Sequence, residues 1–565
     1  MFLFCLRPLI YLLCLTGCGA FLYAEPSGED LPIYRQIDQI IGKSLADAGL
    51  TPAAISSDAE FVRRIYLDLN GVIPTALQAA TFLDDPSADK RQQLIETLLA
   101  SPEYAIHFAR VFDVMLLERR TPAGGTSLDV PPASWLEYLT EAFAENRPWD
   151  IMAGEILGGD GTDERRSAAV RFYLARDVNP HQLTRDIGRL FLGIDLQCAQ
   201  CHDDPRFKDY LQADYYGLYA FLERTKLHPV KPKGALLGEL AVSNTQFTSV
   251  FTAESGETNP RLPGGGMIAD PPLEKDKEYL TKPESGERGI PVYSRRLKLS
   301  EELPRTATRG FAGNLANRMW ALLLGRGIIH PLDLRHAANP PSHPELLDLL
   351  ESWLIDHHYD IKGLLREITL SQTYQRSSVI PEGVSSLPEE AFAVAPLRGL
   401  TAEQFRWSVL QATGRIEAHL AMLDSQPSKS EPGTSPSWKR KLEHLDALAR
   451  QSSALMSVFA GLPGQPEAGF QPTVDQALHL MNSPKLIALL NAKPDTAIGR
   501  PLSIAESGLV VEELYLSVLA RRPTSGESSA VSLTLEQSGS SAEKSATLNS
   551  LRWGLLLSAE FRLNH

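Results

Sequence analysis

Apolar residues recur every three or four positions along most of this chain, which is the pattern of helices that bury one face. The clearest case is the stripe formed by Phe61, Val62, Ile65 and Leu69. Residues 57–60 form a capping box that starts this helix, and Asn70-Gly71 supplies a residue able to adopt the left-handed conformation that ends it. The pattern therefore predicts a helix over residues 58–70.

The same reasoning predicts helices throughout the rest of the chain. Start signals stand at Thr75 with Gln78, at Ser101-Pro102, at residues 342–345 and at Thr401 with Gln404. Apolar stripes predict further helices over residues 94–99, 135–143, 183–194, 215–224, 311–323 and 346–354. We expect a mainly α protein.

Residues 229–305 differ from the rest because prolines and glycines interrupt them repeatedly. Alternation over residues 247–251 predicts one short strand. We therefore expect two helical domains, 35–228 and 306–565, joined by an irregular, partly β insertion at 229–305. The Ser-rich and Pro-rich stretches 424–437 and 535–546 are typical of exposed loops.

Composition narrows the protein class. The 565 residues are 43% hydrophobic and 22% charged, which is ordinary for a globular protein, and too many for a single core. The net charge is −14, and the lysines and arginines form no block. A strongly acidic chain without a basic stripe is a poor candidate for binding nucleic acid.

Residues 1–24 have the pattern of an export signal, with Arg7 followed by the apolar run 9–15. The apolar stretch up to Ala24 is short for a membrane span. Residues 15–18 read Leu-Thr-Gly-Cys, which is typical of a bacterial lipoprotein box with cleavage before Cys18 and lipid on its thiol. The expectation is a protein exported to the periplasm or cell envelope and held at the membrane by the lipid anchor only.

The remaining two cysteines form a C-x-x-C-H motif, Cys198-Ala-Gln-Cys201-His202. In a c-type haem site, two thiols at this spacing bond the porphyrin vinyl groups and the adjacent histidine binds the iron. The motif therefore predicts haem c, with His202 as the proximal iron ligand. The spacing does not mark the second axial ligand, for which the candidates are His107, Met115, Met152 and His181.

Two other interpretations of the motif stay open. Cys198 and Cys201 could form a disulfide or an exchangeable dithiol, since export leads to an oxidising compartment. They could also bind a different metal together with His202 and a carboxylate such as Asp203 or Asp204, although adjacent residues rarely supply well-separated tetrahedral ligands.

Other polar residues point to structure rather than chemistry. His343 stands in a predicted capping box, where packing is the simpler interpretation, and His357-His358 closes a helix. Asp68 and the pair Arg63-Arg64 are expected to form ion pairs on a helix surface. The sequence contains no G-x-S-x-G and no H-E-x-x-H motif, so it gives no local signature of a hydrolase.

Several blocks together resemble a family of large exported planctomycete proteins, in which a cytochrome-associated domain (PSCyt two) precedes a companion domain (PSD one). The resemblance covers roughly residues 35–228 and 306–565. It rests on residues 61–75, 98–104, 145–149, 191–203, 317–320, 339–348 and 512–516. Family members usually carry a second histidine where this chain has Asp204, so if that histidine is a ligand in relatives, this chain needs another. Both domains are of unknown function, and the resemblance adds no activity.

The sequence thus predicts a cytochrome-c-like envelope protein that uses its single C-x-x-C-H for electron transfer or other redox chemistry. The redox or envelope partner stays unknown, as does any enzymatic activity. The alternative is a non-enzymatic envelope binding or assembly protein whose two cysteines form a structural disulfide. A hydrolase without local signatures is a third possibility.

Overall fold

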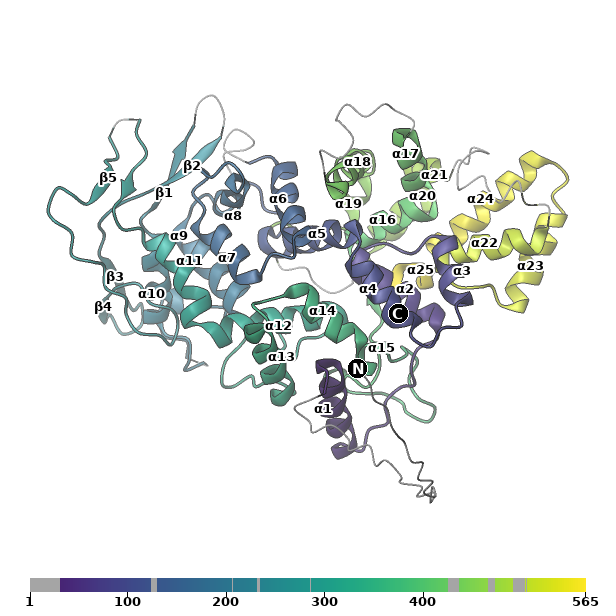
Figure 1. The fold of residues 1–565 in the computed structure, drawn as a ribbon, viewed down its shortest axis with the longest axis horizontal. Helices are drawn as coiled ribbons and strands as arrows, with labels where there is room; N and C mark the ends of the chain where they lie inside the picture. Colours follow the sequence, from purple (N-terminus) through teal and green to yellow (C-terminus); the bar gives the residue numbers. More distant parts are fainter. Residues whose placement is uncertain are drawn as a thin grey trace, which may run out of the picture.

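The computed structural model describes residues 31–122, 130–205, 207–230, 234–284, 286–424, 436–465, 473–490, 504 and 506–565. The structure is 58% helical, which confirms the mainly α prediction (Figure 1). The predicted leader 1–24, with Cys18, lies outside the described residues, as do residues 425–435 of the predicted loop 424–437. Within the described part of the chain, none of the helices is long and apolar enough to span a bilayer.

The described part of the segment before the insertion consists mainly of helices. Its α-helices are α1 Ile33–Asp47, α2 Asp58–Asn70, α3 Ala76–Asp84, α4 Lys90–Leu99, α5 Pro102–Leu117, α6 Pro132–Ala144, α7 Trp149–Gly158, α8 Arg171–Leu174, α9 Pro180–Ile187 and α10 Gln212–Leu222. Shorter turns are the 3-10 segments η3 Ser167–Val170 and η5 Cys198–Gln200, and the π segment η4 Gly188–Leu192.

Most of the predicted helix ends are confirmed. Ser57 caps α2 by accepting a hydrogen bond from the Glu60 amide, and Gly71 ends the helix with φ of 70°. Complete capping boxes open α3 at Thr75 and α16 at Thr401. The predicted box at residues 342–345 is wrong, because the N-cap of α13 is His343, whose side chain makes no capping hydrogen bond.

The insertion is irregular and partly β, as predicted, and forms three antiparallel strand pairs (Figure 1). The strands are β1 Thr225–Pro229, β2 Ala235–Glu239, β3 Thr245–Thr248, β4 Ser255–Thr258, β5 Tyr279–Thr281 and β6 Ile290–Pro291. The strand predicted over residues 247–251 begins two residues earlier and ends at Thr248, and its Phe247 pairs with Gly256.

Helices resume after the insertion. They are α11 Arg295–Thr306, α12 Thr308–Leu324, α13 Pro344–Asp356, α14 Ile361–Leu370, α15 Gln372–Gln375, η6 Glu389–Ala391, α16 Ala402–Ala412, α17 Arg415–Asp424, α18 Ser437–Gln451, α19 Ser453–Phe459, α20 Val474–Asn482, α21 Pro484–Leu489, α22 Ser507–Leu519, α23 Ser525–Glu536, α24 Ser541–Leu557 and α25 Ala559–Arg562. A final antiparallel pair joins β7 Arg398–Gly399 to β8 Leu563–Asn564. The loop predicted over residues 535–546 is largely wrong, since α24 already begins at Ser541.

The largest apolar core is built from both sides of the insertion. Its centre includes Trp149, which stacks on Phe191 at 5.5 Å and on Phe311 at 6.1 Å between ring centroids. A second core lies among α16, α19 and the helices from α20 onward, and it also takes in Leu67 and Ile73 from the early part of the chain. The two helical segments are therefore packed together, and the predicted domain limits at 35–228 and 306–565 stay predictions.

Three charged side chains of α2 lie inside the protein rather than on its surface. Arg63, Arg64 and Asp68, hereafter the α2 charge cluster, are 0%, 3% and 3% exposed. The prediction of surface ion pairs here is therefore wrong. Burial of such groups requires that hydrogen bonds replace the lost water.

The hydrogen bonds of this cluster come from remote segments. Arg63 donates to backbone carbonyls of Val518, Glu560, Phe561 and Leu563, and Arg64 donates to those of Tyr374, Arg376 and His565. Asp68 accepts from Arg398 Nη2 at 2.8 and 2.9 Å, from the Tyr374 hydroxyl at 2.8 Å and from Asn564 Nδ2 at 2.7 Å. The cluster thus attaches the β7–β8 pair and α15 to α2.

Candidate functional site

The C-x-x-C-H motif follows a break in helical structure. Helix α9 continues into the π segment η4, which ends at Gly193 with φ of 71°. A bridge between Ile194 and Leu334 then holds the chain in place before the turn η5. Single π turns inside helices often occur at functional sites, and this one directs the chain from α9 into the motif.

The turn η5 presents both cysteines at the surface. The Cys201 amide donates to the Cys198 carbonyl at 3.3 Å, which closes one turn between them. Ala199 is fully buried, whereas Cys198 and Cys201 are exposed and are not bonded to each other. Ala199 therefore anchors the turn to the body of the protein and the two sulfurs stay accessible.

His202 is held through its ring nitrogen Nδ1. Its Nδ1 lies 2.6 Å from the Asp203 carbonyl oxygen, so Nδ1 carries the proton and donates it. When a neutral imidazole donates from Nδ1, its lone pair is on Nε2. Phe251, which is 75% exposed, packs on the imidazole at 4.4 Å between centroids. The insertion also contacts the motif through the Val250 amide, which donates to the Cys201 carbonyl at 3.0 Å.

The two neighbouring carboxylates are engaged in local structure. Asp203 accepts from the Gln212 amide at 2.7 Å, and buried Asp204 accepts from the Phe207 amide at 3.3 Å. Over the described ranges, no three His, Cys, Asp or Glu side chains are grouped so as to hold a metal ion. The interpretation of an all-protein metal site thus finds no ligand set here, whereas a haem iron needs only the histidine from this loop.

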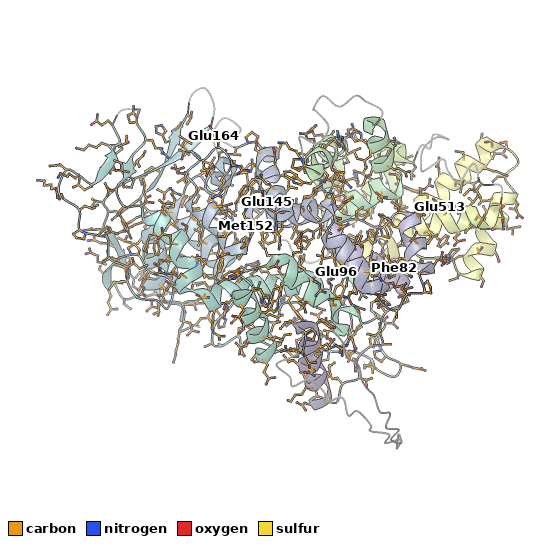
Figure 2. All side chains as sticks on the ribbon, in the orientation of Figure 1. Phe82, Glu96, Glu145, Met152, Glu164 and Glu513 are labelled. Carbon is orange, nitrogen blue, oxygen red and sulfur yellow. The ribbon has the colours of Figure 1, made fainter. Side chains whose placement is uncertain are left out.

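Three of the four candidates for a second axial ligand lie in packed interior positions. Met152 on α7 is 0% exposed among the core helices (Figure 2), and Met115 packs against the same core. His107 is buried against Gly71. The pKa of His107 is lowered to about 3, mainly by burial and also by the nearby Arg110, while a hydrogen bond to the Asp68 backbone acts in the opposite direction.

His181 on α9 has a different setting. Its Nδ1 lies 2.8 Å from the hydroxyl of Tyr215, and its ring contacts Tyr219 at 4.6 Å. Helix α10, which carries these tyrosines, packs against both α9 and η5. Burial raises the pKa values of Tyr215 and Tyr216, and the sulfur of Cys201 adds to both shifts. His181 is thus connected to the motif through the aromatic side chains of α10.

The sequence reasoning missed this group of tyrosines. Tyr215, Tyr216 and Tyr219 lie on one helix, and Tyr216 stacks on Phe247 of β3 at 5.0 Å with an interplanar angle of 10°. The available signal was the aromatic spacing over residues 215–219 directly after the motif. Without the fold, that spacing indicated only a buried helix face.

The other histidine predictions concern packing. His343 is buried beside Phe392 and its Nε2 lies 3.1 Å from the Ser44 hydroxyl, so the packing interpretation is confirmed. His357 follows α13 as its C-cap and stacks on Trp353 at 4.3 Å. Neither residue belongs to the C-x-x-C-H loop.

Comparison with protein families gives two matches in the order suggested by the sequence. Residues 36–227 match PSCyt2, a protein of unknown function (DUF1549), and residues 295–535 match PSD1, a protein of unknown function (DUF1553). No curated protein and no solved structure matches the chain. The chain belongs to the family in which a PSCyt2 domain is followed by a PSD1 domain.

Proposed function

We propose that this chain is an exported c-type haem protein that attaches haem through Cys198 and Cys201 and uses it for electron transfer or other redox chemistry. The observation that carries the proposal is the geometry of one short turn. Cys198 and Cys201 are exposed at the two ends of one turn, and the adjacent imidazole of His202 is held through Nδ1, which leaves Nε2 as the nitrogen for the iron.

The residues present suit covalent attachment. Each thiol S–H would add across one vinyl group, forming a carbon–sulfur bond while the proton goes to the other vinyl carbon, so no external oxidant is required. Nδ1 donation to a backbone carbonyl fixes the ring and makes Nε2 more basic, which is how proteins commonly orient a metal-binding histidine. When bound, haem supplies one-electron transfer at the iron.

The position of the loop suits exchange with a partner. The thiols lie at the surface and Phe251 exposes an apolar ring beside them. We include His181 as the second axial ligand, because its hydrogen-bond partner Tyr215 lies on α10, which packs against both α9 and η5. We also propose that the protein has a redox partner, that lipid on Cys18 anchors it, and that it is located at the cell envelope.

The test is expression of the whole chain with a cytochrome c maturation system, followed by a denaturing gel stained for haem. The wild type should keep its colour after denaturation, and Cys198→Ala and Cys201→Ala should each lose most of it. His202→Ala should shift the absorption spectrum of the bound haem, whereas His357→Ala, a substitution of an exposed histidine away from the loop, should leave it unchanged.

A colourless wild-type band, in a host where a known cytochrome c is coloured, would overturn the haem proposal. In that case a mobility difference between reduced and oxidised protein would favour the alternative, an envelope binding or assembly protein with a structural Cys198–Cys201 disulfide. Cys18→Ser tests the anchor separately, since it should move the protein from the membrane fraction to the soluble fraction.

A further inference from the structure

A cavity of about 400 Å³ lies far from the C-x-x-C-H loop, between α2 and α5 on one side and α16, α17 and α18 on the other. Figure 1 shows α10, next to the loop, towards the left end of the molecule and α16–α18 to the right of centre. The volume is within the usual range of small-molecule sites. The proposed haem chemistry makes no use of this cavity.

Much of the cavity wall is aliphatic. The apolar contributors are Val72, Ile73, Ile106, Ile416, Leu420 and Leu445. They come from both halves of the chain, so the cavity exists only when the helices of the two halves are packed together. Such a wall favours a ligand with an apolar body.

Two hydrogen-bond donors among the lining residues have no acceptor. Nη2 of Arg110 and Nε1 of Trp407 are both buried, and neither has a hydrogen-bond partner among the described residues. The Arg110 guanidinium lies over the Trp407 ring at 4.1 Å, so stacking holds the two groups together. Buried donors without acceptors are uncommon in native structures and often indicate a missing partner.

The electrostatic surroundings define the charge that would suit this cavity. Burial and the nearby Arg406 lower the pKa of Arg110, while Asp446, Glu403 and Asp113 act in the opposite direction, and the net pKa is about 9. None of these carboxylates accepts a hydrogen bond from Nη2. A negatively charged group inside the cavity would accept the unused hydrogen bond of Arg110 Nη2 and lie close to its positive charge.

The remaining polar groups limit that anion to a single charge. Glu103 and Glu417 also line the cavity, and Glu103 is paired with Lys441. A ligand with several negative charges would face these carboxylates, whereas one carboxylate can be directed to Arg110 and Trp407. A cationic head group at that end would meet the Arg110 guanidinium and the two donors.

We propose that this cavity binds an amphipathic monocarboxylate. Its carboxylate accepts hydrogen bonds from Arg110 Nη2 and Trp407 Nε1, and its apolar body packs against the aliphatic wall. The geometry of the two donors and the wall carries the assignment, and it stands whether or not the protein binds haem.

The first test compares three probes that each carry a ten-carbon chain, namely decanoate, decanol and decyltrimethylammonium, on the whole protein. Binding is measured by isothermal titration calorimetry below the micelle concentration of each probe. Decanoate should bind saturably and at least tenfold more tightly than the other two. Equal affinities, tighter binding of the ammonium probe or a lack of saturable decanoate binding would each overturn the proposal.

Matched variants locate the site. Arg110→Met should abolish the preference for decanoate over decanol, and Trp407→Phe should reduce it several-fold by removing one N–H. Arg406→Met is the control, because Arg406 also lies over the Trp407 ring, at 4.8 Å, but does not line the cavity. Loss of the preference in the Arg406 variant but not in the Arg110 variant would contradict the proposal. If circular dichroism shows that Arg110→Met does not fold, the comparison of the three probes on the wild type still tests the proposal.

Discussion

The α2 charge cluster and the C-x-x-C-H loop are both short groups of reactive or charged side chains, and the fold treats them in opposite ways. Arg63 and Arg64 are turned into the protein and donate to backbone carbonyls, and buried Asp68 accepts from side chains. Cys198 and Cys201, by contrast, are exposed to solvent. In the cluster, every partner is another part of the chain. In the loop, the sulfurs are left accessible to a molecule from outside.

This difference separates a structural role from a chemical one. A buried charge whose hydrogen bonds are satisfied within the fold holds segments together, and removal of one member leaves the others buried without partners. Exposed thiols contribute little to packing, so their placement on one turn calls for another explanation. The comparison therefore predicts large stability effects at α2 and small ones at the loop.

The largest effect should come from Asp68→Ala. This change leaves Arg398, the Tyr374 hydroxyl and Asn564 without their shared acceptor, so we expect a loss of about 3–5 kcal/mol in the free energy of unfolding. Urea unfolding followed by circular dichroism measures it. Asp47→Ala is the control, because the Lys43–Asp47 pair is exposed and should contribute under about 1 kcal/mol. Equal losses of unfolding free energy in the two variants would contradict the distinction between the buried α2 charge cluster and an exposed ion pair.

The next effect concerns Gly71, which ends α2. Its φ is +70°, and a Cβ at this position would overlap the imidazole of His107. Gly71→Ala should therefore cost about 2–4 kcal/mol, from backbone strain and overpacking together. Gly49→Ala has similar strain, with φ of +66°, but faces open space, so it should cost only about 1 kcal/mol in the same urea experiment. A similar cost at both positions would show that the contact with His107 contributes nothing.

A smaller, pH-dependent effect should come from His107. Its pKa is about 3 in the fold and about 6.5 in an unfolded chain, so the unfolded state binds the proton more readily. Its contribution to stability is complete above pH 6.5 and is lost as the pH falls towards 3. Between pH 7 and pH 5 this amounts to about 2 kcal/mol, which His107→Gln should remove from the pH profile. His357→Gln, at an exposed histidine, should keep the wild-type slope.

The smallest effect should come from the cysteines. In haem-free, reduced protein, Cys198→Ala and Cys201→Ala should each change the free energy of unfolding by no more than about 0.5 kcal/mol, as is usual for exposed positions. The same variants should abolish covalent haem after maturation. A marked loss of stability in oxidised wild-type protein on reduction, with no haem bound, would instead support a structural disulfide.

Local signals in the sequence predicted the local structure well. Ser57, Gly71, Thr75 and Thr401 act as expected because caps depend on residues three or four positions apart. The prediction for Arg63 was wrong because its acceptors lie 455 to 500 positions away and no local pattern marks them.

The candidate site likewise has some features that the sequence predicts and others that only the fold reveals. The motif could be recognised because its two cysteines and its histidine lie within five consecutive residues. The tautomer of His202 and the proximity of His181 depend on how the insertion, α9 and α10 pack around the loop, so they required the fold. The unpartnered donors of Arg110 and Trp407 likewise come from separate halves of the chain.

The long separation between Arg63 and its acceptors also bears on the order in which the molecule assembles. Helix α2 is synthesised 497 to 500 residues before the carbonyl groups of Glu560, Phe561 and Leu563 that accept hydrogen bonds from its Arg63 guanidinium. Until those residues arrive, Arg63 must remain hydrated and the surrounding apolar faces exposed, which is the situation in which chaperones are needed. Helix α2 should therefore become resistant to proteases only after residues 560–563 are in place.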